Sequence, residues 1–120
     1  MAKKILIIDD NEQDKKIMKR FLNRAGYTEI DTAENGTEGI QKVGEAKPDL
    51  VILDTILPDM MGFEVCSRLR ENYTSGALKI VMTTGAVDAV DALKARQAGA
   101  DDYCVKTSDC VPLLEALKNL

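Results

Sequence analysis

The sequence predicts an α/β fold in which helices pack on both faces of a parallel β-sheet. Five short apolar runs alternate with five segments whose apolar residues recur at helical spacing. Parallel neighbouring strands need long crossover connections, and the intervening helices would supply them. The most apolar runs are continuous, as expected for strands covered on both faces. At 120 residues the chain has the length of one domain, and we expect residues 1–120 to form it.

The first three elements are strongly patterned. Residues 5–8, Ile-Leu-Ile-Ile, are a continuous apolar run within a strand predicted over residues 4–9. Over residues 11–25, apolar side chains recur at i, i+1, i+4 and i+5, which predicts a helix with one buried stripe that ends at Gly26. Residues 28–33 alternate between polar and apolar, which is typical of an edge strand.

The next helix and strand repeat this order. Asn35 can cap a helix that continues to residue 46, and Pro48 prevents it from continuing further. Residues 50–53, Leu-Val-Ile-Leu, predict a second buried strand, and this strand leads directly into Asp54. Two buried strands are therefore both followed by acidic residues.

The second half continues the alternation. After a loop, a helix is predicted to run to about residue 71, and residues 78–84 form a third buried strand. Residues 88–97 predict an alanine-rich helix of weak amphipathicity, followed by a short strand over residues 99–105. From residue 109 onward, leucines at helical spacing predict the last helix.

Polar side chains gather at the predicted carboxyl ends of the strands, where an open parallel sheet forms its binding crevice. They are Asp9, Asp10, Asp54, Thr84 and Lys106. Three crowded carboxylates repel one another unless a cation joins them, and hard oxygen ligands suit Mg²⁺. An ammonium group and a hydroxyl would assist a phosphoryl group, and one carboxylate could itself act as the nucleophile that forms an aspartyl-phosphate.

Composition excludes several other kinds of site. The chain has no histidine, so it can form neither a serine–histidine nor a cysteine–histidine nucleophile pair, and it cannot carry a phosphohistidine. Its cysteines, Cys66, Cys104 and Cys110, lack a C-x-x-C pair and are expected to be free and mostly buried. A net charge of −4 argues against direct binding to nucleic acid or to an anionic membrane. The absence of a long apolar stretch makes a cytoplasmic location the expectation.

These residues together resemble the receiver domain of two-component response regulators, and the chain is similar to the chemotaxis response regulator. The resemblance covers all 120 residues and implies a flavodoxin-like (βα)5 fold with the strand order 2-1-3-4-5. The motifs that carry it are the acidic pair Asp9-Asp10, the D-x-x-x-P-x-x-x-G loop of Asp54, Pro58 and Gly62, the pair Thr84-Gly85, the aromatic Tyr103, and Lys106.

The resemblance implies that Asp54 accepts a phosphoryl group from a phosphohistidine, carried by a sensor histidine kinase or a histidine phosphotransfer protein. It implies a Mg²⁺ ion bound directly by Asp10 and Asp54, through water by Asp9, and by the backbone carbonyl of Ile56. The domain would then be a signalling domain and not an enzyme, because it would assist only its own phosphorylation and dephosphorylation.

The same resemblance implies a two-state switch. Lys106 would pair with Asp54 before the transfer and with a phosphoryl oxygen afterwards, Thr84 would move to bind another oxygen, and Tyr103 would turn inward. The surface that changes would be the fourth helix, fifth strand and fifth helix, roughly residues 88–120. An effector protein, a covalently linked output domain or a second copy of the chain could bind there.

Two departures from the family pattern carry expectations of their own. Thr107 follows Lys106 where the family usually has a proline joined by a cis peptide. Because a cis bond before a non-proline residue costs about 2.5–4 kcal/mol, we expect the Lys106–Thr107 bond to be trans. Ile56 and Ala86 are apolar at positions where relatives often carry polar residues that orient the hydrolytic water, which predicts a long-lived phosphoryl state.

The residues argue against two other functions and leave a third open. A Mg²⁺-dependent phosphatase would need a second acid two residues after Asp54, where Ile56 stands. A flavin or nucleotide module would need a phosphate cradle after the first strand, where the acidic residues would repel phosphate. A receiver-like interaction module that is never phosphorylated stays open, although such modules usually lose the acids or the lysine. The sequence also leaves open whether the chain acts alone or belongs to a longer protein, and which kinase and output it serves.

Overall fold

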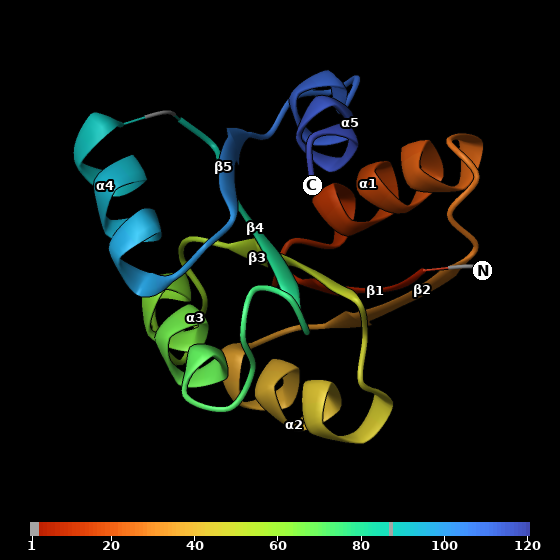
Figure 1. Cartoon of the computed structure of the whole chain (residues 1–120). Helices are drawn as coiled ribbons and strands as arrows, with labels where there is room; N and C mark the ends of the chain where they lie inside the picture. Colours follow the sequence, from red (N-terminus) through yellow and green to blue (C-terminus); the bar gives the residue numbers. More distant parts are fainter. Residues whose placement is uncertain (1–2, 87) are drawn as a thin grey trace.

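Strands and helices alternate along the described chain of this computed structural model, residues 3–86 and 88–120 (Figure 1). The strands are β1 (Lys4–Ile8), β2 (Glu29–Ala33), β3 (Leu50–Asp54), β4 (Lys79–Thr84) and β5 (Asp102–Val105). The helices are α1 (Glu12–Arg24), α2 (Gly36–Ala46), α3 (Gly62–Arg70), α4 (Ala89–Ala98) and α5 (Val111–Lys118). All strand pairs are parallel and the order is β2-β1-β3-β4-β5, which confirms the predicted fold class.

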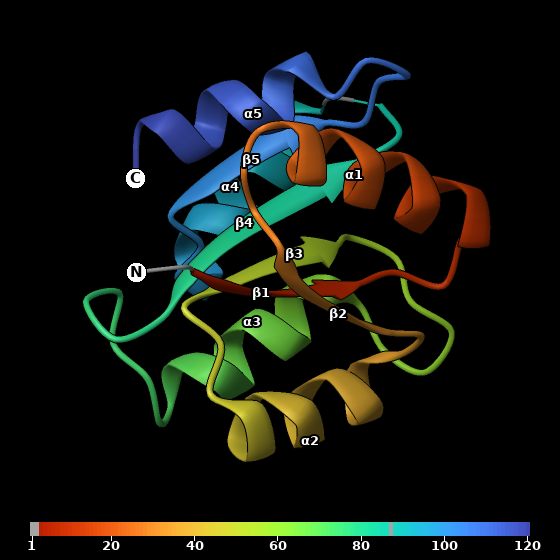
Figure 2. The same ribbon diagram turned by 90° about the vertical axis from the view of Figure 1, so that its right-hand side faces the viewer.

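Two helical layers cover the sheet. In Figures 1 and 2, α1 and α5 lie on one face and α2, α3 and α4 on the other. Successive side chains of a strand point to opposite faces, so Ile5 and Ile7 pack with α1 and α5, whereas Leu6 and Ile8 pack with the other three helices. Each of these four side chains is at most 2% exposed, which explains why the run is apolar throughout.

The predicted cap at Asn35 is confirmed, and Asn11 caps α1 in the same way. Asn11 Oδ1 accepts a hydrogen bond from the backbone N–H of Asp14 at 2.9 Å, and Asn35 Oδ1 accepts one from the N–H of Glu38 at 2.8 Å. The longest helix, α1, has 13 residues. None of the helices in the described part of the chain has the length and hydropathy of a membrane span.

The last strand and helix are shorter than predicted, for local reasons. Gly99 has φ +103° and forms the left-handed cap of α4, so β5 begins at Asp102 and not at residue 99. Asp109 accepts a hydrogen bond from the N–H of Val111 at 3.1 Å, and α5 begins only at Val111.

All three cysteines are free and buried, as predicted. Burial raises the pKa of the Cys66 thiol to about 11 and that of Cys104 to about 12. These thiols are therefore protonated at neutral pH and serve as small apolar side chains of the core.

Candidate functional site

The sheet brings the predicted site residues to one edge. Because β1 and β3 are neighbours in register, Asp9 and Asp54 stand at adjacent strand ends. On the other side of β3, β4 ends at Thr84, whose partner in β5 immediately precedes Lys106. The crevice expected beyond the carboxyl ends of the strands is therefore lined by acids from two strands, a hydroxyl and an ammonium group.

Three carboxylates form a cluster at this edge. One oxygen each from Asp9, Asp10 and Asp54 lies within 4.8 Å of the others. Asp9 is 1% exposed, Asp54 is partly buried and Asp10 is exposed. Asp9 Oδ1 accepts a hydrogen bond from the N–H of Asn11 at 2.9 Å, whereas its buried Oδ2 accepts none of good geometry. The cluster thus joins one fully buried acid to one that faces solvent.

The donor set of this cluster fits Mg²⁺. All of its ligand atoms are hard carboxylate oxygens, and the exposure of Asp10 leaves room for the water molecules that Mg²⁺ keeps. Asp9 Oδ2 is paired with the Lys106 ammonium at 2.7 Å but accepts no hydrogen bond of good geometry from the described residues, and a metal-bound water could donate one.

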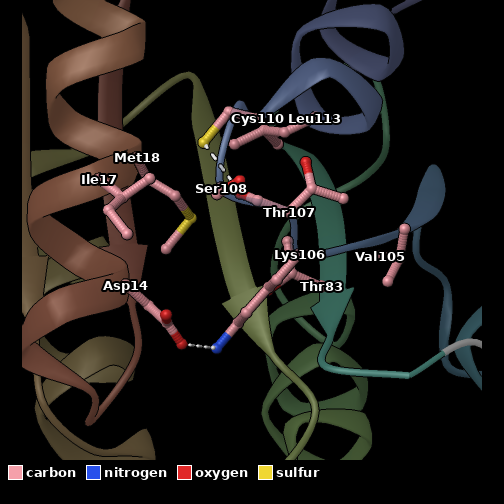
Figure 3. A pocket seen from close by; sticks show the side chains of 10 residues that line it. All are labelled: Asp14, Ile17, Met18, Thr83, Val105, Lys106, Thr107, Ser108, Cys110 and Leu113. Atoms are coloured by element: carbon pink, nitrogen blue, oxygen red, sulfur yellow. Dashed lines mark hydrogen bonds and ion pairs between the residues drawn. The ribbon is translucent and has the colours of Figure 1, made fainter.

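The ammonium group of Lys106 lies among three carboxylates. Its Nζ is 2.7 Å from Asp9 Oδ2, 2.9 Å from Asp14 Oδ2 and 3.3 Å from Asp54 Oδ1. Of these three contacts, the one to Asp14 has hydrogen-bond geometry (Figure 3). Asp14 was not among the predicted site residues, because its contact with Lys106 joins residues 92 positions apart and leaves no local pattern in the sequence.

The connection that carries Lys106 has the expected backbone path. Between the described residues every peptide bond is trans, Lys106–Thr107 included, which confirms the expectation drawn from Thr107. The chain then turns into α5 through Cys110, whose φ of +55° lies in the left-handed region.

Burial and charge shift the titration of the site. Burial, followed by the nearby charge of Asp9, raises the pKa of Asp54 to about 6, and Lys106 acts against this rise. Burial lowers the pKa of Lys106, but its close contacts with Asp9 and Asp14 and the charge of Asp54 outweigh burial and leave that pKa above its ordinary value. At neutral pH, Lys106 is therefore charged and Asp54 is mostly ionised.

Thr84 and Tyr103, two of the three predicted switch residues, form no side-chain hydrogen bond with the site carboxylates among the described residues. The hydroxyl of Thr84 donates a hydrogen bond to the carbonyl of Ala86 at 3.0 Å, and no hydrogen bond between described residues joins it to Asp54 or Lys106. The ring of Tyr103 packs against the core on the α2–α3–α4 face, and its buried hydroxyl has no hydrogen-bond partner among the residues that the structure describes.

The loop after Asp54 is closely fitted to its surroundings. Gly62 donates a backbone hydrogen bond to the carbonyl of Thr55 at 2.7 Å, and a Cβ on Gly62 would overlap the carbonyl oxygen of Asp54. Ile56, whose carbonyl is an expected metal ligand, forms an isolated β-bridge with Met61 and has a side chain that is 67% exposed. The glycine of the motif is thus required by close approach of the backbone.

Asp59 of the same loop forms hydrogen bonds with the start of α2. Its carboxylate accepts hydrogen bonds from the N–H of Gly36 at 2.8 Å, and from the N–H and hydroxyl of Thr37 at 2.9 and 2.7 Å. The Thr37 hydroxyl and these backbone donors lower the pKa of Asp59 to about 2. The contact of Asp59 with the start of α2 was not predicted, because a cap from a residue so distant in sequence leaves no local pattern.

A cavity of about 260 Å³ adjoins the site between α1 and the β5–α5 connection (Figure 3). Met18 of α1 and Leu113 of α5 line it, together with Cys110. Asp14 and Lys106 stand at its border with the carboxylates. One side of the Lys106 side chain therefore faces this space.

A parallel sheet of this order with acids and a lysine at its strand ends is the arrangement that the resemblance to receiver domains implies. Residues 5–118 match the sequence profile of the family described as "Response regulator receiver domain". The chain belongs to this family, the receiver domains of two-component response regulators.

Curated relatives are longer regulators. The chain is 40% identical over 106 residues to the alkaline phosphatase synthesis transcriptional regulatory protein PhoP of Bacillus subtilis, a match that covers 88% of the chain and 43% of PhoP. It is 30% identical over 120 residues to the response regulator PleD of Caulobacter vibrioides, covering 100% of the chain and 26% of PleD. The chain thus spans less than half the length of these two relatives.

Solved structures share the whole fold. The response regulator protein TrrA of Thermotoga maritima, crystallised in complex with Mg²⁺-BeF, is 36% identical with a TM-score of 0.87, and the match covers 98% of both chains. The chemotaxis protein CheY4 of Vibrio cholerae is 29% identical with a TM-score of 0.88, covering 99% of this chain and 98% of CheY4.

Proposed function

We propose that the chain is a phosphoryl-accepting signalling domain whose Asp54 is phosphorylated in a Mg²⁺-dependent reaction. The observation that carries the proposal is the partly buried Asp54 carboxylate beside two further acids, with the Lys106 ammonium 3.3 Å away. The phosphoryl donor would be a phosphohistidine of a sensor histidine kinase or a histidine phosphotransfer protein. The domain would transmit a signal and would not turn over a separate substrate.

The acids would have unequal roles toward Mg²⁺. Both oxygens of Asp9 are already engaged, one by the N–H of Asn11 and the other by Lys106 at 2.7 Å, which favours contact through water. Asp10 is exposed and Asp54 is partly so, which supports direct binding by these two residues. The backbone carbonyl of Ile56 would be the remaining protein ligand. Bound Mg²⁺ would supply positive charge to the oxygens of the transferring group.

In the transfer, a carboxylate oxygen of Asp54 would attack the phosphorus atom of the donor. The new O–P bond forms while the P–N bond of the phosphohistidine breaks, and its electron pair returns to the imidazole nitrogen. With a pKa of about 6, Asp54 is ionised at neutral pH and ready to attack. Lys106 would donate a hydrogen bond to a phosphoryl oxygen and so stabilise its charge.

The added phosphoryl group would bias a two-state switch. Thr84 would leave the carbonyl of Ala86 for a phosphoryl oxygen, and Tyr103 would repack. Residues 88–120 would carry the change to an effector, to an output domain or to a second copy of the chain. Val90 and Leu93 of α4 are 60% and 56% exposed, which supports a binding role for this surface.

Phosphorylation can be tested with a small donor such as acetyl phosphate and intact-protein mass spectrometry. The wild-type chain should gain one phosphoryl group only when Mg²⁺ is present, and Asp54→Asn should gain none. Asp91→Asn, which removes an acid from α4, is the matched control and should behave as wild type. A chain that takes up no phosphoryl group and shows no Mg²⁺-dependent binding of beryllofluoride would instead be an interaction module.

A further inference from the structure

We propose that Asp14 is a positioning residue for Lys106, holding the ammonium group in place for the phosphoryl group on Asp54. The inference rests on the proposed function. Asp14 Oδ2 accepts the hydrogen bond from Lys106 Nζ at 2.9 Å, whereas the contacts of that nitrogen with Asp9 and Asp54 are ion pairs without hydrogen-bond geometry. An ammonium group has three donors, so the bond to Asp14 leaves two for the acceptors at the site.

Asp14 stands outside the group of acids that would bind the metal. The cluster consists of Asp9, Asp10 and Asp54. A divalent cation on these three acids would weaken their attraction for Lys106, because it would neutralise their charge. The carboxylate of Asp14 would keep its full charge and would remain the anchor of Lys106 in the metal-loaded domain.

Once a cation is bound to the three clustered acids, Lys106 would have few other contacts to hold its ammonium group in place. A lysine has a flexible four-carbon stem, and holding its ammonium group in one place requires contacts along that stem or at its end. One side of Lys106 faces the cavity of about 260 Å³, and Met18 and Cys110 line the cavity without closing it (Figure 3). The bond to Asp14 is thus the contact that restrains the ammonium group on the α1 side.

A simpler role for Asp14 is to place negative charge near the start of a helix. Glu12 shares that role, because both are acids in the first turn of α1. Glu12 pairs with Lys15 at 2.8 Å, and its side chain is 65% exposed. Glu12→Gln therefore serves as the matched control, removing the same charge from the same helical turn without touching Lys106.

The experiment measures phosphorylation by acetyl phosphate against Mg²⁺ concentration in wild type, Asp14→Asn, Asp14→Glu and Glu12→Gln. Asp14→Asn should lower the rate at saturating Mg²⁺ by about tenfold, because Lys106 is no longer oriented. The Mg²⁺ concentration at half-maximal rate should change by less than about threefold, because no metal ligand is lost. Asp14→Glu should recover part of the rate, and Glu12→Gln should match wild type.

A measurement on the wild-type chain does not depend on any variant folding. In the NMR spectrum, the Lys106 ammonium protons should exchange with water more slowly than those of the surface lysines, and should stay protected when Mg²⁺ is added. Loss of that protection on Mg²⁺ addition would overturn the inference. So would an Asp14→Asn rate that matches Glu12→Gln or exceeds wild type. Failure of the wild-type chain to be phosphorylated at all would instead overturn the proposed function.

Discussion

Lys106 Nζ lies 2.7 Å from Asp9 Oδ2, closer than it lies to Asp54. This pairing separates the two acids that follow β1, because Asp9 is engaged by the protein itself whereas Asp10 faces solvent. Asp9 is therefore placed to pair with Lys106, and Asp10 is placed to bind a ligand from solvent.

Mg²⁺ affinity should fall more in Asp10→Ala than in Asp9→Ala. Loss of the exposed, direct ligand should weaken binding about 100-fold, whereas loss of the acid that acts through water should weaken it about tenfold. Isothermal titration of the two variants with Mg²⁺ measures both effects. Equal losses would contradict the assignment of direct and water-mediated roles.

Stability should depend on pH through Asp54. Its pKa is about 6 in the folded chain against an ordinary value of 3.8, so the folded state binds this proton more tightly than the unfolded state. The free energy of unfolding should therefore fall as pH rises from about 4 to 6, where Asp54 loses its proton. Above about pH 6, the ionised Asp54 should lower the free energy of unfolding by about 1–2 kcal/mol, a figure reduced for screening by solvent.

Asp54→Asn should consequently be more stable than wild type above about pH 6 in metal-free buffer, and the two should converge below about pH 4. Urea unfolding at several pH values measures the difference. Added Mg²⁺ should stabilise wild type more than the variant. A variant less stable than wild type at neutral pH without metal would refute the prediction.

The phosphoryl group should be long-lived. Ile56 is 67% exposed and, like Ala86, has no polar side-chain atom to orient a hydrolytic water. Ile56→Asn should shorten the half-life of the phosphorylated domain about tenfold, and Ile56→Leu should leave it unchanged. Loss of radiolabel from purified phosphorylated protein gives the rate, and a wild-type half-life of seconds would rule out the idea.

Gly62→Ala should destabilise the domain by about 1–3 kcal/mol, because the new methyl group would overlap the carbonyl oxygen of Asp54. Gly44→Ala is the natural comparison, since Gly44 lies in α2 with open space around it. That change should stabilise the domain by up to about 1 kcal/mol through helix propensity. Similar effects of the two substitutions in urea unfolding would argue against the close fit of the Asp54 loop.

The fold was predictable because its signals are local. The continuous apolar runs, the cap at Asn35 and the glycine after α1, Gly26, each act within a few residues. The acids at the strand ends were also predictable, since parallel strands bring their carboxyl ends to one edge.

The remaining features of the site depend on side chains that meet across the fold. Lys106 contacts three acids, and its contact with Asp14 depends on how α1 packs near the end of β5. The contact of Asp59 with the start of α2 joins residues 22 and 23 positions apart. Neither leaves a periodic or adjacent pattern in the sequence.

The hydrogen bonds of Asp59 to the start of α2 make one side of the site more firmly held than the other. On the α2 side, three hydrogen-bond donors at the start of the helix bind Asp59 in the loop after β3. On the other side, Ala95 alone among the described residues of α4 is buried, so that helix is weakly held. A structural change that starts at Asp54 should therefore displace α4 more than α2. Amide hydrogen exchange should change more in α4 than in α2 when Asp54 is phosphorylated.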